Sequence, residues 1–517
     1  MILFWAPFPA RGLVREGWMR RIAAIDRLFA QHERHYVFHA TDPAVGDDYR
    51  VREARVDGVP VTAVDLRLLA HQRRLTELVE ACDFVYAHTA HASRALLPYY
   101  ATGKVISDLH GLAAEEEAML GRPARSRFFA PLEDAMLRGS AAIVTVTDAM
   151  AAHLRAKHEG LHTETITLPV VDEAPADPPG SVADRDGADP PTVVYAGGLQ
   201  AWQNVDRMFA TVADARRPFR FLFCSDAVDA ARRRARVAGV ERDVEFRFCP
   251  PAELAAIYRR AQYGFVLRDD DPVNRVSCPT KLAEYLAHGV IPIVDLAEIG
   301  DFASLGYRYV RRSDWLAGRW PDAGASQAMR DQNLAVWHAL RAVHDRGRAR
   351  LGELAAAVPR STAGTARSLL MSPAERAFAF ADRAGWLRYR RGDVTREVTL
   401  DDLPLPPEPI EIPLPGDGPL RALRFVPYAA PFVTTPIAAD LLCCGGGTIA
   451  LRIDGGFEVD RFGNWCFRDA AAHCTAKAVD VADPRTLRLR FDLALAGPEV
   501  AWVRRRRFGF RRGGLSR

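Results

Sequence analysis

The stretch Ser277–Val294, SCPTKLAEYLAHGVIPIV, decides the fold prediction for the middle of the chain. Pro279 suits the first position of a helix, where its missing N–H is not needed, and Gly289 suits the position just past the helix end. The apolar run VIPIV that follows is typical of a buried strand. An apolar stripe with i, i+3, i+4 spacing would pack this helix on the sheet: Leu282, Tyr285 and Leu286.

A second face of the same helix carries Lys281, Glu284 and His288. The free N–H groups at a helix start suit phosphate oxygens, and Lys281 adds a cation there. A carboxylate such as Glu284 accepts hydrogen bonds from the vicinal hydroxyls of a ribose. The face therefore predicts a nucleotide site, but a surface Lys–Glu pair accounts for the same residues equally well.

The stretch Val193–Asn204, VVYAGGLQAWQN, runs from a strand into a Gly-Gly turn and then into a helix. Gly197 and Gly198 would let the backbone approach a ligand closely. A tight turn without a ligand explains the two glycines as readily.

Two segments, 1–172 and 192–322, alternate short apolar runs with amphipathic stretches. Each predicts a parallel sheet covered by helices, and two such units joined by the Pro- and Asp-rich linker 173–191 would enclose a cleft. The strands expected in the two units are Ile2–Trp5, Tyr36–His39, Phe84–His88, Val105–Asp108, Ile143–Thr147, Thr192–Ala196, Phe219–Cys224, Val244–Phe248, Tyr263–Leu267 and Val290–Val294.

The remainder of the chain divides into three parts. Residues 323–400 are expected to be a helical connector, and 401–500, which alternate polar and apolar residues between turn signals, an antiparallel β-sandwich. Trp465 and Phe467 suit a core position or a sugar-stacking surface. The tail 501–517 carries seven arginines and no acidic residue, which suits either peripheral contact with an anionic membrane or a disordered basic end.

Composition excludes several classes of protein. The chain has 517 residues, 49% hydrophobic and 26% charged, which suits about three globular domains. Its net charge is only +4, and the seven arginines of the tail contribute more than that. The rest of the chain is therefore mildly acidic, which argues against a nucleic-acid-binding protein. No window of about 18 uncharged apolar residues predicts a membrane span. The eight cysteines are not spaced as metal ligands usually are. They are expected to be reduced core residues of a cytoplasmic protein.

The glycine turn and the Glu-containing helix, about 85 residues apart, together resemble the retaining glycosyltransferases of the GT-B fold, in the large family-4-like group. The resemblance covers about residues 1–350. It implies an α/β fold with two Rossmann-like domains facing a cleft, an N-terminal acceptor domain and a C-terminal donor-binding domain. It also implies a nucleotide-diphosphate-sugar donor, no resident cofactor or metal, and transfer with retention.

By the resemblance, Glu284 matches the second glutamate of the family's paired-glutamate motif, which binds the donor ribose. The first glutamate would fall at Val276 and is absent, as are the Arg and Lys that clamp the diphosphate after the glycine turn. Lys281 is the expected substitute for that clamp. The catalytic residues expected are His110, Glu284 and Lys281, and the donor-binding residues expected are Gly12, Gly197, Gly198, Gln200, Phe248, Cys278, Pro279, Thr280, Lys281 and Glu284.

The N-terminal half carries Ser107–Glu117, SDLHGLAAEEE, at the end of an expected strand. The family often has a histidine at the position of His110, close to the reacting sugar, although a histidine that bonds a loop carbonyl suits the same place. The acceptor-binding residues expected are Asp108, His110, Glu115 and Glu116. The only DxD-like stretch, Arg268–Asp271, is expected to be a solvated loop, so no metal site is predicted.

The function expected is therefore a cytoplasmic hexosyltransferase, peripheral at the inner membrane face, that builds a surface polysaccharide on a glycan or lipid-linked acceptor. Two alternatives stay open. One is another nucleotide-sugar enzyme, such as an epimerase. The other, suggested by the absent glutamate and clamp, is a degenerate transferase that acts as a glycan-binding or scaffold protein.

Overall fold

The computed structural model describes residues 1–10, 17–39, 51–64, 66, 69–171, 190–216, 218–357, 384–400, 409–428, 432–434, 436–455, 457–459, 465–467, 473–476, 481–482, 484–491, 493–496 and 511–512. Three earlier predictions therefore lie outside the described residues. These are the contribution of Gly12, the linker apart from residues 190–191, and the basic tail apart from residues 511–512.

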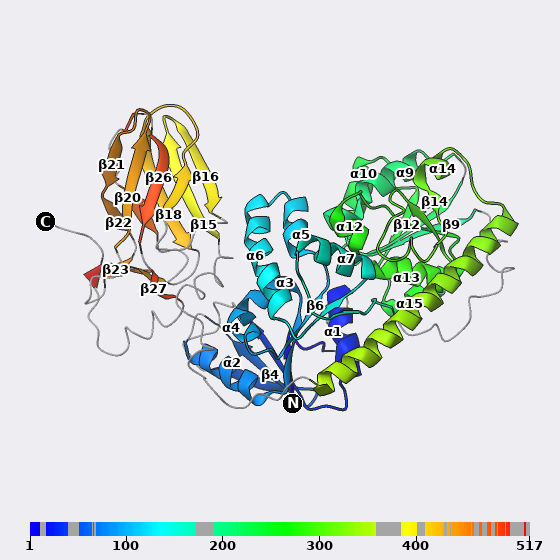
Figure 1. Ribbon diagram of the computed structural model, residues 1–517. Coiled ribbons are helices and arrows are strands. Elements are labelled where there is room, and N and C mark those ends of the chain that lie inside the picture. The colour runs from blue at the N-terminus through cyan, green and yellow to red at the C-terminus, as the bar shows by residue number, and fades with distance from the viewer. Residues whose placement is uncertain are drawn as a thin grey trace.

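The first unit is an eight-stranded sheet in the order β3-β4-β2-β1-β5-β6-β7-β8, parallel throughout except for the β3–β4 hairpin. Along β1, Leu3 and Trp5 enter one hydrophobic core while Ile2 and Phe4 enter another, because alternate side chains point to opposite faces. Helices cover both faces, as Figure 1 shows. The elements are β1 (Ile2–Trp5), α1 (Gly17–Leu28), β2 (Arg34–His39), β3 (Arg52–Val56), β4 (Val59–Val64), α2 (Leu69–Ala81), β5 (Phe84–His88), α3 (Ala90–Ser93), η1 (Arg94–Leu96), α4 (Leu97–Tyr100), β6 (Val105–Leu109), α5 (Ala113–Met119), α6 (Pro123–Gly139), β7 (Ala142–Thr145), α7 (Asp148–Lys157) and β8 (Thr165–Thr167).

The second unit is a fully parallel six-stranded sheet in the order β11-β10-β9-β12-β13-β14. The strand order reverses between β9 and β12, and ligands of such sheets bind beyond the carboxyl ends of the strands at this reversal. The elements are β9 (Thr192–Ala196), η2 (Ala201–Gln203), α9 (Val205–Ala213), β10 (Arg220–Cys224), α10 (Val228–Val237), β11 (Val244–Arg247), α11 (Pro251–Arg260), β12 (Tyr263–Val266), α12 (Pro272–Val276), α13 (Thr280–Ala287), β13 (Ile291–Val294), β14 (Val310–Arg311), α14 (Arg312–Leu316) and α15 (Ala323–Ala357).

Helix α15 runs from the second unit back to the first (Figure 1). Its Leu351 packs in the core of the first unit, and His344 Nδ1 lies 2.9 Å from the carbonyl oxygen of Pro169. Gly347 permits this approach, because a Cβ there would lie 2.3 Å from the carbonyl oxygen of Thr167. The helix therefore joins the two units into one assembly.

Direct contacts also join the units. Thr147 Oγ1 donates to the carbonyl oxygen of Val276 at 2.5 Å. The carboxylate of Asp301 accepts from the backbone N–H groups of Asp148 and Ala149, at 2.8 and 2.9 Å, and so caps the start of α7 from the other unit. These contacts fix the edge along which the two units meet.

The last part of the chain forms antiparallel sheets, with β16-β15-β18-β25-β22 and β17-β26-β20-β21 as the two larger ones and β27-β19-β24-β23-β28 as a third. The helical interpretation of 323–400 was wrong from Ala384 on, because β15 and β16 belong to this region. Trp465 is buried and stacks on Phe457 at 4.1 Å, so it is a core aromatic. The elements are β15 (Ala384–Arg391), β16 (Val394–Leu400), β17 (Ile410–Pro413), β18 (Leu420–Tyr428), β19 (Phe432–Thr434), β20 (Ala438–Cys443), β21 (Thr448–Leu451), β22 (Ile453–Gly455), β23 (Glu458–Val459), β24 (Trp465–Phe467), β25 (Cys474–Ala476), β26 (Pro484–Arg490), β27 (Leu493–Ala496) and β28 (Arg511–Arg512).

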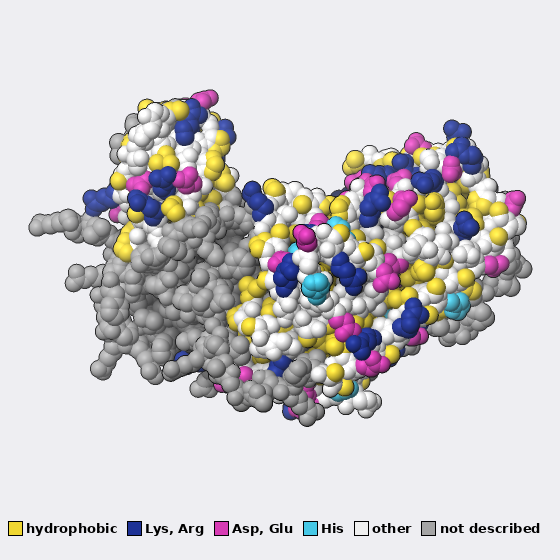
Figure 2. Space-filling model, viewed as in Figure 1, with side chains coloured by type: hydrophobic (Ala, Val, Ile, Leu, Met, Phe, Trp, Pro, Cys, Tyr) yellow, Lys and Arg dark blue, Asp and Glu magenta, His cyan; other side chains and the backbone are white. Residues whose placement is uncertain are grey.

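The face of the molecule drawn in Figure 2 is mixed in charge. On the face drawn in Figure 2, basic and acidic side chains are interspersed over both α/β units. None of the helices in the described ranges has the length and apolar character needed to cross a membrane.

Candidate active site

Lys281 stands in the first turn of α13, where the carboxyl ends of β9 and β12 meet. Its Nζ donates to Gln203 Oε1 at 2.6 Å and lies 4.0 Å from the centre of the Tyr195 ring. The side chain is only 7% exposed. The structure thus brings the predicted lysine against the loop that follows the glycine turn.

Gly197 is required by this arrangement. Its φ is 152°, and a Cβ there would lie 2.9 Å from Lys281 Nζ and 3.1 Å from the Tyr195 hydroxyl. The next glycine, Gly198, lies against the side-chain amide of Gln200 and accepts a hydrogen bond from Tyr195 at its carbonyl. The glycine turn therefore shapes the space around the lysine.

Arg268 lies at the same edge, two residues after β12, and the prediction of a solvated loop was wrong for it. It is 7% exposed and donates to Asn274 Oδ1 at 3.2 Å and to the carbonyl oxygen of Trp202 at 3.3 Å. The three aspartates that follow have other partners. Asp269 pairs with Arg207, Asp270 pairs with Arg275, and Asp271 caps α12.

Lys281 and Arg268 are buried cations with neutral partners. Within the described part of the chain, neither has a carboxylate oxygen within 4.0 Å. Burial lowers the pKa of Lys281 well below its ordinary value, and the charge of Arg268 lowers it further. Burial also lowers the pKa of Arg268 to about 10. Buried cations without a counter-charge are costly, so this site suits an anionic ligand.

Glu284, one turn along α13, is engaged at both carboxylate oxygens. Oε1 accepts from Arg20 Nη1 at 2.6 Å, and Oε2 accepts from the Tyr258 hydroxyl at 2.9 Å. Arg20 belongs to α1 of the first unit, so this ion pair crosses the junction. The ribose ligand predicted for Glu284 would have to share or replace these partners.

The neighbouring residue of α1, Arg21, points into the first unit instead. Its Nε and Nη2 donate to the two oxygens of Asp108 at 3.0 and 2.9 Å, and a third N–H donates to the carbonyl of Leu168. The Tyr86 hydroxyl also donates to Asp108, at 3.0 Å. The Arg21 guanidinium holds the pKa of Asp108 well below its ordinary value despite complete burial.

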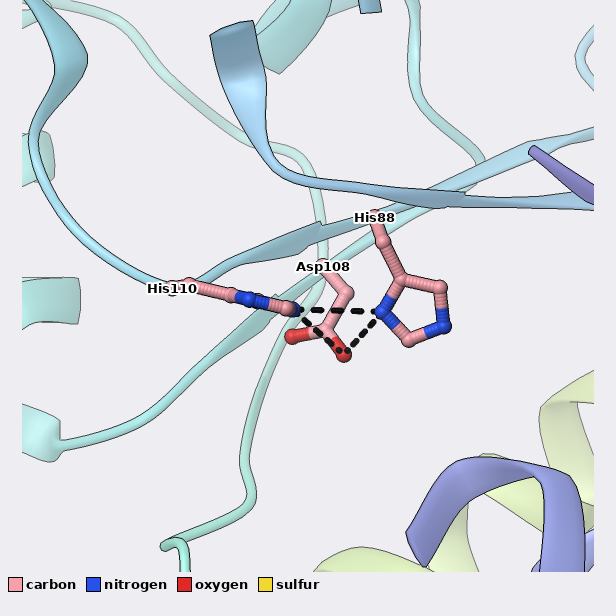
Figure 3. A group of neighbouring side chains, drawn as sticks. All are labelled: His88, Asp108 and His110. Carbon is pink, nitrogen blue, oxygen red and sulfur yellow. Dashed lines mark hydrogen bonds and ion pairs between the residues drawn. The ribbon is translucent and has the colours of Figure 1, made fainter. Parts of the chain in front are cut away.

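Figure 3 shows two histidines beside this carboxylate, at the carboxyl ends of β5 and β6. His88 Nδ1 lies 3.2 Å from His110 Nε2, and these atoms are 3.5 and 3.7 Å from Asp108 Oδ2. Burial lowers the pKa of His88 to about 3. Arg20 contacts Glu284, and Arg21 contacts Asp108 beside His110. Because these two arginines are adjacent in α1, Glu284 and His110 lie on either side of one short stretch of this helix.

The same three side chains have the composition of a metal site. Their donor atoms are spaced as three ligands of a tetrahedral ion would be. However, Asp108 is already neutralised by Arg21, whose Nε lies 3.0 Å from the oxygen that an ion would need. A dication there would be repelled by the guanidinium, so we assign no metal to the group.

The acidic residues predicted to bind an acceptor behave differently from one another. Asp108 is completely buried, so it cannot contact an acceptor directly and that prediction was wrong. Glu115 pairs with Lys157 at 2.8 Å and lies 3.2 Å from His153. Glu116 lies against Gly111, and burial together with the charge of Glu117 raises the pKa of Glu116 to about 7.

The remaining predicted donor residues take varied positions. Phe248 follows β11 and is 52% exposed. Cys278 packs where cores of the two units meet. Pro279 occupies the N-cap of α13 rather than its first helical position, which Thr280 takes. Sequence reasoning missed His88 and Arg268, and for both the signal was a polar residue at the carboxyl end of a buried parallel strand.

Comparison with known proteins agrees with this architecture. Residues 9–170 match the family model described as a glycosyl transferase 4-like domain. The fold is similar to that of sucrose-phosphate synthase from Thermosynechococcus elongatus, at 16% identity and a TM-score of 0.50, over 68% of this chain and 97% of that one. An α,α-trehalose 6-phosphate synthase from Burkholderia multivorans is also similar, at 14% identity and a TM-score of 0.49, over 69% and 99% of the two chains. Among curated proteins, no sequence matches.

The predicted fold is thereby confirmed: two Rossmann-like sheets, a long connecting helix and additional antiparallel sheets. The family match falls on the unit that carries Asp108 and His110, and the fold likeness covers 68% of the chain, more than that unit alone. The chain therefore has the GT-B fold, with a match to a glycosyl transferase 4-like domain at residues 9–170 and antiparallel sheets added towards its C-terminal end.

Proposed function

We propose that the protein transfers a sugar, with retention, from a nucleotide-diphosphate sugar bound at the junction of its two α/β units. The observation that carries this proposal is the pair of buried cations, Lys281 and Arg268, at the point where the strand order of the second sheet reverses. A diphosphate supplies the negative charge that neither cation finds in the described residues.

The donor would occupy this site as follows. Lys281, Arg268 and the first N–H groups of α13 hold the diphosphate. Glu284 accepts hydrogen bonds from the ribose hydroxyls, and the exposed ring of Phe248 borders the nucleobase. His110, across the junction, borders the transferred sugar. The cations compensate the charge that develops on the leaving diphosphate.

Transfer breaks the bond between the anomeric carbon and the diphosphate oxygen and forms one to an acceptor hydroxyl oxygen on the same face. The proton of that hydroxyl passes to the leaving phosphate. Lys281 and Arg268 stabilise this group as it departs, since a charge-assisted hydrogen bond is about twice as strong as a neutral one. No protein nucleophile is needed for this course.

The acceptor is a glycan or a lipid-linked saccharide in this proposal, and the product belongs to a surface polysaccharide made at the inner membrane face. Glu115 and Glu116, just beyond His110, are the candidate acceptor contacts. The mixed charge on the face of both units drawn in Figure 2 supports a saccharide rather than nucleic acid as partner. The basic tail is the part of the chain suited to anionic lipid.

One observation favours a second function. Val276 stands where the family's first glutamate would be, and it is buried in a core of the first unit. A carboxylate beside the transferred sugar is therefore missing, which suits a degenerate transferase that binds glycans without turnover. Slow release of sugar from a donor, measured without acceptor, would exclude this alternative.

Calorimetry of the full chain with nucleoside diphosphates and nucleotide sugars tests the proposal. We expect one site per chain, and we expect Glu284→Gln to weaken binding by about 10-fold or more, because a ribose hydrogen bond to a charged acceptor is lost. Glu245→Gln is the matched control, since this exposed glutamate of β11 pairs with Arg220 away from the junction. Equal affinities for the two variants would refute the assignment.

A further inference from the structure

Gln203 is a neutral residue that contacts one of the two buried cations and takes no part in the proposed transfer. It ends η2, the short turn after the two glycines, and it is partly buried. Its Oε1 accepts from Lys281 Nζ at 2.6 Å. Because an ammonium group donates and cannot accept, the amide must face Lys281 with its oxygen. The contact therefore fixes the orientation of this amide.

Three other groups face Lys281, and none of them neutralises it. Arg268 repels the ammonium group. Tyr195 stays neutral, because burial raises the pKa of its hydroxyl, and its ring centre lies 4.0 Å from Lys281 Nζ. Glu284 attracts the ammonium group from more than 4.0 Å away, and both of its oxygens accept from other residues. Among the described residues, the amide oxygen of Gln203 is therefore the hydrogen-bond acceptor that holds the lysine.

The second buried cation is held in the same way. Arg268 Nη1 donates to Oδ1 of Asn274, a residue that is only 1% exposed. The Nδ2 of this amide donates to Asp271 Oδ2 at 2.6 Å and to the carbonyl oxygen of Asp269 at 3.1 Å. The amide thus stands between the guanidinium and the carboxylate of Asp271. Both buried cations of the site therefore meet the oxygen of a carboxamide.

A carboxamide and a carboxylate have nearly the same shape, but they would act differently on these cations. A carboxylate at either place would form a buried ion pair that is complete without a ligand. An amide oxygen fixes the direction of the N–H groups through a hydrogen bond and leaves the positive charge uncompensated. A charge left in this state is available to an anion that enters the site.

We propose that Gln203 is a positioning residue that aims Lys281 without neutralising it, and so keeps the charge of Lys281 available to an anionic ligand. That this ligand is the diphosphate of a nucleotide sugar rests on the proposed function. The effect of Gln203 on the charge of Lys281 does not, because it is a property of the free protein.

The charge of Lys281 is measured directly by NMR of the full chain labelled with 13Cε-lysine, without ligand. The chain has only four lysines, and the Lys281 signal is the one lost in Lys281→Met. In Gln203→Glu the new carboxylate favours the ammonium form, so we expect Lys281 to titrate at higher pH than in wild type. In Gln203→Met, which fills a similar volume and accepts nothing, we expect it to titrate at lower pH.

Calorimetry with inorganic pyrophosphate tests the consequence for binding, since this probe carries the charge of a diphosphate without a nucleobase. We expect Gln203→Glu to lower the affinity for pyrophosphate about 10-fold or more, because the new carboxylate competes with the ligand for Lys281. Ala210→Glu is the matched control. It adds the same charge at an exposed position of α9 in the same unit, and it should bind pyrophosphate as wild type does.

The two measurements can fail separately. If Lys281 titrates at the same pH in wild type and in either Gln203 variant, Gln203 does not control its charge and the inference fails. It also fails if Gln203→Glu binds pyrophosphate as tightly as wild type. If the titrations move as expected but neither pyrophosphate nor a nucleoside diphosphate binds to wild type, the effect of Gln203 on Lys281 stands and the proposed function fails.

Discussion

The two α/β units bury positive charge in opposite ways. In the first unit, Arg21 is buried, and its guanidinium forms an ion pair with both carboxylate oxygens of Asp108. In the second unit, Lys281 and Arg268 are nearly as buried, yet each bonds only neutral oxygens in the described structure. The first arrangement is complete without a ligand, and the second is not.

This difference separates structural charges from ligand-binding ones. A buried pair that satisfies itself holds its surroundings in place, here His88 and His110 around Asp108. A buried cation left without a counter-charge destabilises the free protein and is relieved when an anion binds. Removing the two kinds of charge should therefore have opposite effects on stability and on binding.

Breaking the ion pair between Arg21 and Asp108 should have the largest effect, on the free energy of unfolding. Arg21→Met leaves Asp108 as a buried carboxylate without a cation, which costs about 3–5 kcal/mol of unfolding free energy. Urea unfolding of the full chain measures the loss. Arg138→Met is the control in the same unit, because its pair with Asp134 is exposed and should contribute less than about 1 kcal/mol. A loss no greater than that of the control would contradict the comparison.

Removing an uncompensated cation should weaken binding without weakening the fold. We expect Lys281→Met to lower affinity for a nucleoside diphosphate by about 10- to 100-fold in calorimetry, while the free energy of unfolding stays equal or rises. Arg319→Met, at an exposed pair with Asp314 in the same unit, should change neither quantity.

The pH dependence of stability gives a second readout for Lys281. Its pKa in the folded protein lies below its ordinary value of 10.5, so the unfolded chain binds the proton more readily. Stability of the wild type therefore rises as pH increases towards 10.5, and Lys281→Met should lose that rise. A variant that is both less stable and unchanged in affinity would mean that Lys281 is a structural residue.

Much of the fold was accessible from sequence because the strands of both units are continuous apolar runs. Ile2–Trp5, Phe84–His88 and Thr192–Ala196 have the bounds that the pattern predicted. The hairpin strand Arg52–Val56 was missed because it is exposed and mostly polar. The helical prediction for the residues of strand β15 was wrong, although Leu387 and Tyr389 point inward at the period of two that marks a strand.

The candidate site was only partly accessible. The glycine turn and Lys281 could be joined because strand ends of a parallel sheet meet at one edge. Arg268 was missed because three aspartates follow it, and sequence does not show that each of them bonds elsewhere. Nor does the sequence show that the adjacent residues Arg20 and Arg21 of α1 have partners in different units. Arg20 pairs with Glu284 in the second unit, and Arg21 pairs with Asp108 in the first.

A smaller effect is expected at Glu116, a largely buried carboxyl group that has no cationic partner among the described residues. Its pKa of about 7 in the folded protein exceeds the ordinary value of 4.5, so its contribution to stability is complete below pH 4.5 and is lost as pH rises through 7. Glu116→Gln should be more stable than wild type by about 1–2 kcal/mol at pH 8 and equal to it near pH 4.

The neighbouring residue supplies the control for this measurement. Bonds to Lys157 and His153 lower the pKa of Glu115, although burial opposes them, so its contribution is present at neutral pH and lost in acid. Glu115→Gln should therefore lose stability at pH 8 where Glu116→Gln gains it. Chemical denaturation at the two pH values measures both, and changes of the same sign would show that Glu116 has a partner in solution.

The smallest effect should come from the ion pair that spans the junction. If the donor ribose takes the oxygens of Glu284, it must compete with Arg20, which holds Oε1 at 2.6 Å. Arg20→Leu removes the competitor but leaves Tyr258 on the other oxygen, so affinity for a nucleoside diphosphate should rise about 2- to 5-fold, as expected for a partly exposed pair. A fall in affinity would instead place Arg20 among the ligands of the donor, as a third cation beside Lys281 and Arg268 rather than a competitor for Glu284.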